Sequence, residues 1–307
     1  MREFSLRMID GTELQVYEWS EVKDPIAIVQ LVHGASEYML RYDDFAKRMN
    51  AKGIVVVGDD HRGHGKTAQL HHLPFGFFAN HHGWDKIVND EKLVNDYIQK
   101  KYQNLPIFML GHSMGSFMAR TYAIKYSETI NGLIVMGTGE HSTLACNSLG
   151  TIARIDQLIF GPKRQDKLIW KTTFAPLNKA YAKIGNANGN EWLTRDVDIQ
   201  LEFKNNPLNA GCFTTSAFKD LTDGMKFVAQ KKHIKLMRQD LPIFLVAGDR
   251  DPVGNYGKMV EKVQSKFISL GYKSKIKIYP NLRHEILNEP EKLEVDRDLV
   301  EFINQNL

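Results

Sequence analysis

Short apolar runs alternate with helical patterns along most of this chain, and this alternation restricts its fold more than any other feature. Continuous apolar runs occupy residues 27–32, 54–57, 106–110, 132–136 and 241–246, and a further strand is predicted at 274–280. Helical patterns separate them at residues 42–52, 90–103, 114–126, 255–270 and 291–305. Apolar runs of this length are typical of strands buried on both faces of a parallel sheet. The sequence therefore predicts an α/β fold with a mostly parallel central sheet flanked by helices.

Two segments depart from this rhythm. Near the N-terminus, Phe4, Leu6 and Met8 alternate with polar residues before an Asp10-Gly11 turn, which predicts a β-hairpin. From about residue 140 to residue 232, aromatic residues, Asn/Gly-rich turns and short helical patterns replace the buried strands. We therefore predict a core formed by residues 1–139 and 233–307, and an inserted, mainly helical cap at residues 140–232.

The composition excludes several classes of protein. Net charge is +4 in a chain of 307 residues, which gives no nucleic-acid signature. The two cysteines form no disulfide framework, and neither a signal peptide nor an apolar run of transmembrane length is visible. These features predict a soluble protein of the cytoplasm, and they leave its oligomeric state open.

A serine stands between two glycines in the motif GHSMG at residues 111–115, after an apolar run and before a helical pattern. This order of strand, Gly-x-Ser-x-Gly and helix is typical of a nucleophile raised on a sharp turn, with the following helix N-terminus beside it. Because a serine hydroxyl is a poor nucleophile, it needs a base. We therefore predict Ser113 as a catalytic nucleophile; the alternative is a polar residue in an ordinary turn.

The partners of this serine should follow in the order acid and then histidine, in loops at the C-terminal ends of late strands. His284 lies in such a loop, and it would take the proton from Ser113 and return it to the leaving group. Both Asp249 and Asp251 follow the strand at 241–246, and we favour Asp251, which lies further from the strand and precedes Pro252.

Backbone amides should stabilise the oxyanion. The fold supplies one from the residue after the nucleophile and one from an early loop, here HGASE at residues 33–37, which predicts the N–H groups of Met114 and Ala35. The turn at residues 60–65 has glycines that permit a tight backbone, and we interpret it as a structural support for this loop.

No metal or cofactor is predicted. His71, His72, His81 and His82 occur as adjacent pairs in a loop, an arrangement that points neighbouring side chains apart. The chain also lacks a Gly-x-Gly-x-x-Gly fingerprint after its first parallel strand.

Taken together, five motifs resemble the α/β-hydrolase superfamily, and within it the monoacylglycerol lipase and lysophospholipase group, which is also called serine aminopeptidase S33-like. The motifs are HGASE at 33–37, DHRGHG at 60–65, GHSMG at 111–115, GDRD at 248–251 and RHE at 283–285. By this resemblance, Asp251 is the acid of the triad, and the segment WLTRD at 192–196 is similar to the cap of this group.

The resemblance implies a serine hydrolase that cleaves carboxylic esters through an acyl-enzyme, on monoacylglycerols, lysophospholipids or related small lipid esters. Aromatic residues of the cap suit an apolar acyl chain, and exposed apolar cap surface could contact a micelle or membrane. The alternatives are another hydrolase on the same scaffold (aminopeptidase, lactonase or C–C bond hydrolase) and a binding protein without catalysis. An aminopeptidase would need acids in the cap, where the candidates are Glu191, Asp196, Asp198 and Glu202.

Overall fold

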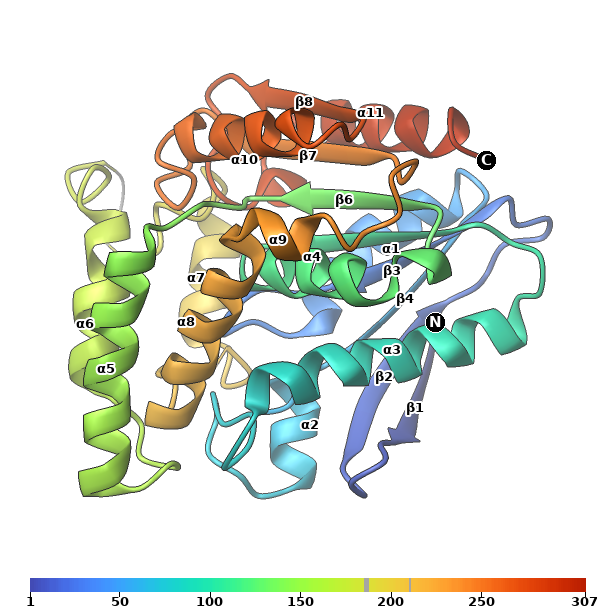
Figure 1. Cartoon of the computed structure of the whole chain (residues 1–307). Helices are drawn as coiled ribbons and strands as arrows, with labels where there is room; N and C mark the ends of the chain where they lie inside the picture. The colour runs from blue at the N-terminus through green and yellow to red at the C-terminus, as the bar shows by residue number, and fades with distance from the viewer. Residues whose placement is uncertain (185–187, 210) are drawn as a thin grey trace.

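An eight-stranded sheet forms the centre of the computed structural model, which describes residues 1–184, 188–209 and 211–307 (Figure 1). The strand order is β1-β2-β4-β3-β5-β6-β7-β8, and β2 runs antiparallel to both of its neighbours while all later pairs are parallel. The strands are β1 (Arg2–Arg7), β2 (Glu13–Trp19), β3 (Ala27–Val32), β4 (Ile54–Asp59), β5 (Ile107–His112), β6 (Gly132–Met136), β7 (Ile243–Gly248) and β8 (Ser274–Tyr279). This topology confirms the predicted α/β fold and the N-terminal hairpin.

Helices cover both faces of the sheet, because the central strands are apolar on both sides. In β3, the side chains of Ile28 and Val32 join one buried cluster, and those of Val29 and Leu31 join the other. Helices α1 and α11 pack in the second cluster, whereas α3, α4 and α10 pack in the first. The core helices are α1 (Asp43–Asn50), α2 (Gly65–Leu70), α3 (Gly83–Lys101), α4 (Met114–Tyr126), α10 (Lys258–Ser269) and α11 (Lys292–Asn304).

Helix α3 begins earlier than the predicted start at residue 90. His82 precedes it in the left-handed conformation, with φ 55°, and the apolar face continues backward through Trp84 and Ile87. The short helix α2 was not predicted, because its six residues are too few to show a helical period.

Among the described residues, the α-helices between β6 and β7 are α5 (Thr143–Phe160), α6 (Lys167–Phe174), α7 (Val197–Asn205), α8 (Thr215–Ala229) and α9 (Lys231–Ile234). The sequence predicted only short helices here, but α5 has 18 residues and α8 has 15. Side-chain caps mark four of their starts, because the side chains of Ser142, Asp166, Asp196 and Thr214 accept hydrogen bonds from backbone amides of the first turn.

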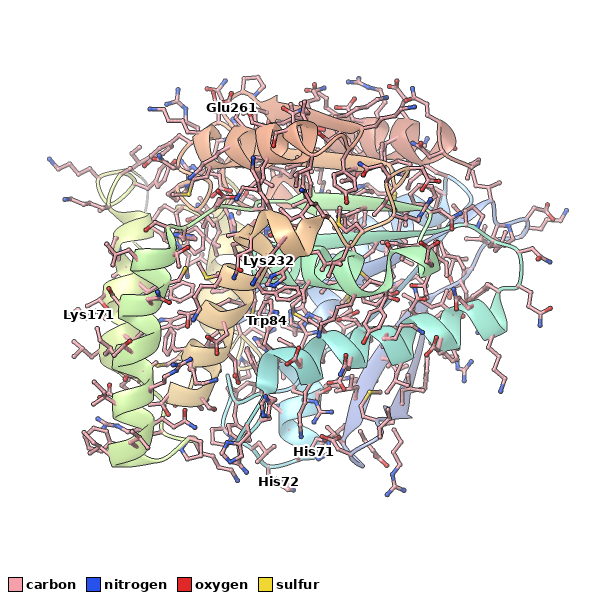
Figure 2. The ribbon with its side chains drawn as sticks, viewed as in Figure 1. His71, His72, Trp84, Lys171, Lys232 and Glu261 are labelled. Atoms are coloured by element: carbon pink, nitrogen blue, oxygen red, sulfur yellow. The ribbon has the colours of Figure 1, made fainter. Side chains whose placement is uncertain are left out.

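Helix α8 joins this inserted segment firmly to the helices on the sheet. Trp84 of α3 lies in the interior of the molecule (Figure 2), and its indole N–H donates to Thr121 of α4. A Cβ at Gly224 of α8 would lie 2.0 Å from the Trp84 ring, so only glycine lets α8 approach this closely. Because α8 packs directly on the core helices, the division of the chain into a core and a cap remains a prediction from the sequence.

Within the described residues, none of the helices combines the length and the apolar character needed to cross a lipid bilayer.

Candidate active site

Ser113 sits on a strained turn between β5 and α4. Its φ is 54° and its ψ is −119°, a backbone conformation that residues other than glycine rarely adopt. The glycines on either side make this turn fit: a Cβ at Gly111 would lie 2.2 Å from the carbonyl oxygen of Gly115, and one at Gly115 would lie 2.1 Å from that of Val32. The motif therefore serves to bring the start of α4 against the end of β3.

His284 and Asp251 meet across two loops that follow β7 and β8. The Nδ1 atom of His284 lies 2.9 Å from Oδ2 of Asp251, and both side chains are buried. The other oxygen of Asp251 accepts a hydrogen bond of 2.8 Å from the backbone N–H of Val253, which fixes the carboxylate. An imidazole held in this way at Nδ1 keeps Nε2 available to accept a proton.

Asp249, the other aspartate of this loop, lies away from His284. Its side chain is 38% exposed and accepts a hydrogen bond of 2.7 Å from the backbone N–H of Asn281. It therefore stabilises the turn after β8, whereas Asp251 is the aspartate beside the histidine.

The loop that carries His284 is fixed by the segment between η3 (Ala175–Asn178) and α7. The backbone N–H groups of His284 and Glu285 donate to the carbonyl oxygens of Trp192 and Leu193, at 3.3 and 2.7 Å. The Trp192 ring lies 5.0 Å from the imidazole of His284. Movement of this segment would therefore be transmitted to the histidine.

The two residues predicted as oxyanion donors, Ala35 and Met114, line a common cavity with Ser113. Met114 is the first residue of α4, where the backbone N–H has no partner within the helix and the helix dipole is positive. Gly34 precedes Ala35, and a Cβ on it would lie 3.1 Å from the Cβ of Ser113, so glycine lets this loop lie close to the serine.

Four charged residues form a buried network behind these loops, and the sequence analysis missed it. Arg41 pairs with Glu37 of the early loop at 2.9 Å and with Glu285 at 2.7 Å. Glu37 also accepts a hydrogen bond from the backbone N–H of Gly34, and its Oε1 lies 3.1 Å from Nδ1 of His112. A signal was present in the sequence, because Glu37, His112 and Glu285 each lie inside a motif that was identified for another residue.

The charges of this network shift the pKa values of its members. Burial alone would raise the pKa of Glu37, but the hydrogen bond to His112 and the charges of His112 and Arg41 hold that pKa well below its ordinary value. Burial alone would lower the pKa of His112, but the hydrogen bond and the charge of Glu37 outweigh it and raise that pKa. The network therefore places an imidazole with a raised pKa directly before Ser113 in the sequence, with its Nε2 at 3.3 Å from the carbonyl oxygen of His284.

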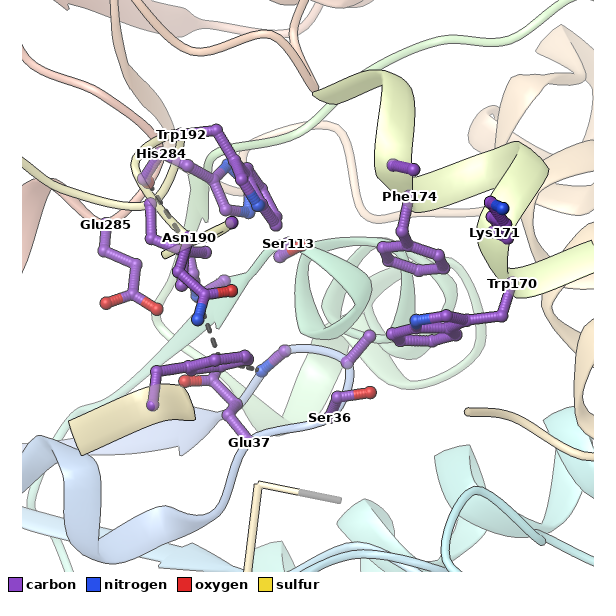
Figure 3. A pocket seen from close by; sticks show the side chains of 17 residues that line it. Ser36, Glu37, Ser113, Trp170, Lys171, Phe174, Asn190, Trp192, His284 and Glu285 are labelled. Atoms are coloured by element: carbon purple, nitrogen blue, oxygen red, sulfur yellow. Dashed lines mark hydrogen bonds and ion pairs between the residues drawn. The ribbon is translucent and has the colours of Figure 1, made fainter. Parts of the chain in front are cut away.

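Two cavities of different character meet at Ser113. One, of about 490 Å³, has mostly apolar walls, including Phe117, Leu149, Leu221 and Met225. The other, of about 260 Å³, is lined by polar as well as aromatic residues, and Figure 3 shows Ser113 in it between His284 with Trp192 and the stacked rings of the helix α6. The serine is thus accessible from an apolar side and from a more polar side.

Known proteins resemble all or part of this chain. A monoacylglycerol lipase from Mycolicibacterium smegmatis is 26% identical over 309 residues, which cover 99% of this chain and 98% of that protein. The monoglyceride lipase of Mus musculus is 31% identical over 127 residues, 41% of this chain and 40% of that protein.

A crystal structure of a highly thermostable carboxyl esterase from Bacillus coagulans, in complex with glycerol, has a TM-score of 0.91 and 29% sequence identity, over 99% of this chain and 98% of that one. Residues 23–291 match the model of the hydrolase family described as serine aminopeptidase, S33. The chain therefore belongs to the serine aminopeptidase S33 family and has the α/β-hydrolase fold.

Proposed function

We propose that this chain is a serine hydrolase that cleaves carboxylic esters through an acyl-enzyme formed on Ser113. The observation that carries the proposal is the meeting of both cavities at Ser113, with His284 in the wall of the smaller one and Asp251 behind that histidine. Relatives that are named as lipases and esterases support the same reaction class.

In this proposal, Ser113 attacks the ester carbonyl while Nε2 of His284 accepts its proton, and the same proton later passes to the leaving alcohol. Asp251 holds the imidazole in the required tautomer and stabilises the imidazolium that forms. The backbone N–H groups of Ala35 and Met114 stabilise the oxyanion of each tetrahedral intermediate. Water then attacks the acyl-enzyme while Nε2 of His284 accepts its proton. The proton returns to Ser113 as the carboxylic acid leaves.

The substrate we infer is a monoacylglycerol or a related small lipid ester. The larger cavity suits the acyl chain, and the smaller cavity, which has the polar side chains of Ser36 and Asn190 in its wall, suits a hydroxyl-bearing leaving group. Two relatives that match this chain are named monoacylglycerol or monoglyceride lipase, which agrees with this division.

The acids that an aminopeptidase would require are engaged elsewhere. Glu191 accepts hydrogen bonds from Asn178 and from backbone amides of its own loop, and Asp196 caps α7. Glu202 pairs with Arg41. Among the described residues that line the two cavities, none of these three acids occurs, and Asp198 does not occur either. This arrangement favours an ester over a peptide substrate with a free amine.

A second part of the proposal is that residues 140–232 act as a cap whose outer face contacts micelles or membranes. Apolar side chains at helical spacing are exposed on α5 and at the start of α6, which are Leu144, Ile152, Ile155, Leu158, Ile159 and Leu168. An apolar face of this kind is typical of an interaction surface. The cytoplasmic location remains a prediction from the sequence, and the sequence leaves the oligomeric state open.

Flotation with phosphatidylcholine vesicles tests the contact. The double variant Leu158→Asp, Leu168→Asp should lose vesicle binding and keep its activity on a soluble ester. Leu293→Asp, at an equally exposed leucine on α11, should bind as the wild type does. Equal binding by all three proteins, or binding by none, would overturn this part.

The esterase itself is tested with p-nitrophenyl esters of two to sixteen carbons. Activity should rise with chain length, and Ser113→Ala should lower it on the order of 10³-fold or more. A preference for the acetyl ester would argue against lipid esters, and an equal rate for both proteins would remove Ser113 from the mechanism.

A further inference from the structure

One imidazole and two carboxylates form a buried cluster outside the proposed active site. Asp59 ends β4, His61 lies in the turn that follows, and Glu91 lies in α3. One ligand atom from each lies within 4.8 Å of the others, and each residue is at most 2% exposed. We call these three residues the His61 cluster.

Both ring nitrogens of His61 face oxygen atoms that can accept a hydrogen bond. Its Nε2 lies 3.2 Å from the carbonyl oxygen of His33, and a neutral imidazole with its hydrogen on Nε2 satisfies this contact. The lone pair of Nδ1 then faces Oδ2 of Asp59 and Oε1 of Glu91, each at 3.2 Å. A lone pair that faces two carboxylate oxygens is repulsive unless a positive species lies among the three.

In the described part of the chain, no lysine or arginine supplies such a species. Over residues 1–184, 188–209 and 211–307, neither Asp59 nor Glu91 forms an ion pair with a lysine or an arginine. Arg62, in the same turn, is paired with Asp10 and Asp90 instead. Oδ1 of Asp59 and Oε1 of Glu91 are buried and have no hydrogen-bond partner among the described residues. Buried carboxylate oxygens without partners are costly, and such atoms commonly mark a ligand.

We propose that the His61 cluster binds a divalent transition-metal ion, with Zn²⁺ as the best fit. Zinc with ligands at about 2.0–2.1 Å in a tetrahedron separates neighbouring ligand atoms by about 3.3 Å. Both distances from Nδ1 of His61 to the carboxylate oxygens agree with this spacing. One nitrogen and two carboxylate oxygens are ligands that zinc accepts, and water would complete the tetrahedron.

The groups around the cluster match those that support metal ligands in proteins. A histidine that binds a metal normally donates its other N–H to a carbonyl or a carboxylate, as His61 does to His33. Carboxylate ligands are themselves hydrogen-bonded, and Oε2 of Glu91 accepts from the side-chain amide of Gln30 at 2.9 Å.

The metal ion that we infer is structural. The rings of His61 and His33 stack with centroids 3.7 Å apart, and His33 directly precedes Gly34 and Ala35 of the early loop. An ion in the His61 cluster would therefore tie α3 and β4 to the segment that leads into this loop. It would not contact the ester.

A proton is the competing explanation, because a hydrogen on Nδ1 of His61, which would donate to Asp59 at 3.2 Å, or a protonated Glu91 would also remove the repulsion. Burial, and then the charge of Asp59, raise the pKa of Glu91. The two explanations differ in whether the purified protein contains a metal ion.

The test measures zinc content by mass spectrometry of the elements, and zinc affinity by calorimetry after removal of metal with a chelator. The wild type should contain about one zinc ion per chain, and Glu91→Gln should lose it, with affinity at least 100-fold lower. Asp96→Asn, at an exposed carboxylate of the same helix, is the matched control and should keep the ion. Cobalt in place of zinc should give the strong visible absorption of a tetrahedral site in the wild type and in Asp96→Asn, but not in Glu91→Gln.

Two results would overturn the proposal. A wild-type protein that binds no zinc would leave the proton as the explanation, and this result does not depend on whether a variant folds. Zinc that remains in Glu91→Gln would place the ion elsewhere, for example at the histidine pair His71 and His72, which lies at the edge of the molecule (Figure 2). If Glu91→Gln fails to fold, Gln30→Met should still lower zinc affinity by about 10–100-fold.

Discussion

Glu37 gives the sharpest prediction about the buried network, because its carboxylate lies between the guanidinium of Arg41 and the imidazole of His112. It faces His112 at 3.1 Å and Arg41 at 2.9 Å, and it also accepts a hydrogen bond of 2.9 Å from the hydroxyl of Tyr42. In Glu37→Gln, the amide cannot neutralise the guanidinium, and its NH₂ group would face Arg41 or His112.

Removal of one partner from a buried ion pair costs about 3–5 kcal/mol. Arg41 keeps Glu285, so we expect the lower end, about 3 kcal/mol. For a chain of 307 residues, such a loss lowers the melting temperature by roughly 5 °C. Activity should also fall, by on the order of tenfold or more, because Glu37 anchors the backbone N–H of Gly34 next to Ala35.

The same arginine provides the control. Glu202 pairs with Arg41 at 3.3 Å, but its side chain is 36% exposed, so Glu202→Gln should cost less than about 1 kcal/mol. Urea unfolding gives the free energies, and kcat/KM on a p-nitrophenyl ester, taken well below the melting temperature, gives the effect on catalysis. Equal losses for the two variants, or a loss below 1 kcal/mol for Glu37→Gln, would refute the argument from burial.

Four further predictions follow from the site. Asp251→Asn should lower kcat on the order of 10³–10⁴-fold with KM nearly unchanged, while Asp249→Asn stays within a few-fold of wild type in steady-state kinetics. Met225→Trp should fill part of the apolar cavity. Exclusion of three methylene groups of the acyl chain, at about 0.8 kcal/mol each, lowers kcat/KM for long acyl esters roughly 50-fold. The value of kcat/KM for a butyrate ester should be unchanged. Gly115→Ala places a Cβ 2.1 Å from a carbonyl oxygen of β3, so urea unfolding should show a loss of about 1–3 kcal/mol, and an unchanged midpoint would contradict the close packing. The pKa of His112 is raised in the folded protein, so its contribution to stability is full below its unfolded pKa of about 6.5. This contribution is lost as pH rises through the higher folded pKa. The unfolding free energy of the wild type should therefore decline above pH 7 relative to that of His112→Gln.

The sequence predicted the parts of this fold that depend on local pattern. The apolar runs and their spacing gave the strands and their parallel pairing, and the helix from Met114 to Tyr126 was predicted to the residue. Ser113, Asp251 and His284 were found because the fold requires each at the end of a particular strand, and the structure brings Asp251 and His284 together. Their catalytic roles stay a prediction until they are assayed.

Contacts between distant segments were not predictable. The pairing of Arg41 with Glu285 joins residues far apart in the chain, and no period or spacing marks it. The His61 cluster was missed for a related reason. Adjacent histidines are visible in the sequence, whereas Asp59 and Glu91 converge only because α3 packs over the end of β4.

The length of α5 was missed because its buried residues are small, namely Cys146, Gly150 and Ala153, so it lacks the large apolar inner face that usually identifies a surface helix. Gly224 shows the same limit on a smaller scale. A glycine inside a helical pattern weakens the prediction of a helix, and only the packed structure shows that Trp84 needs the space.

The central claim is that Ser113 is an activated nucleophile, and labelling with a fluorophosphonate tests it most directly. Intact mass should show one adduct on the wild type and on Ser265→Ala, an exposed serine of α10, and none on Ser113→Ala. Peptide mapping should place the adduct on Ser113. A wild type that stays unlabelled, or an adduct that persists in Ser113→Ala, would contradict the claim.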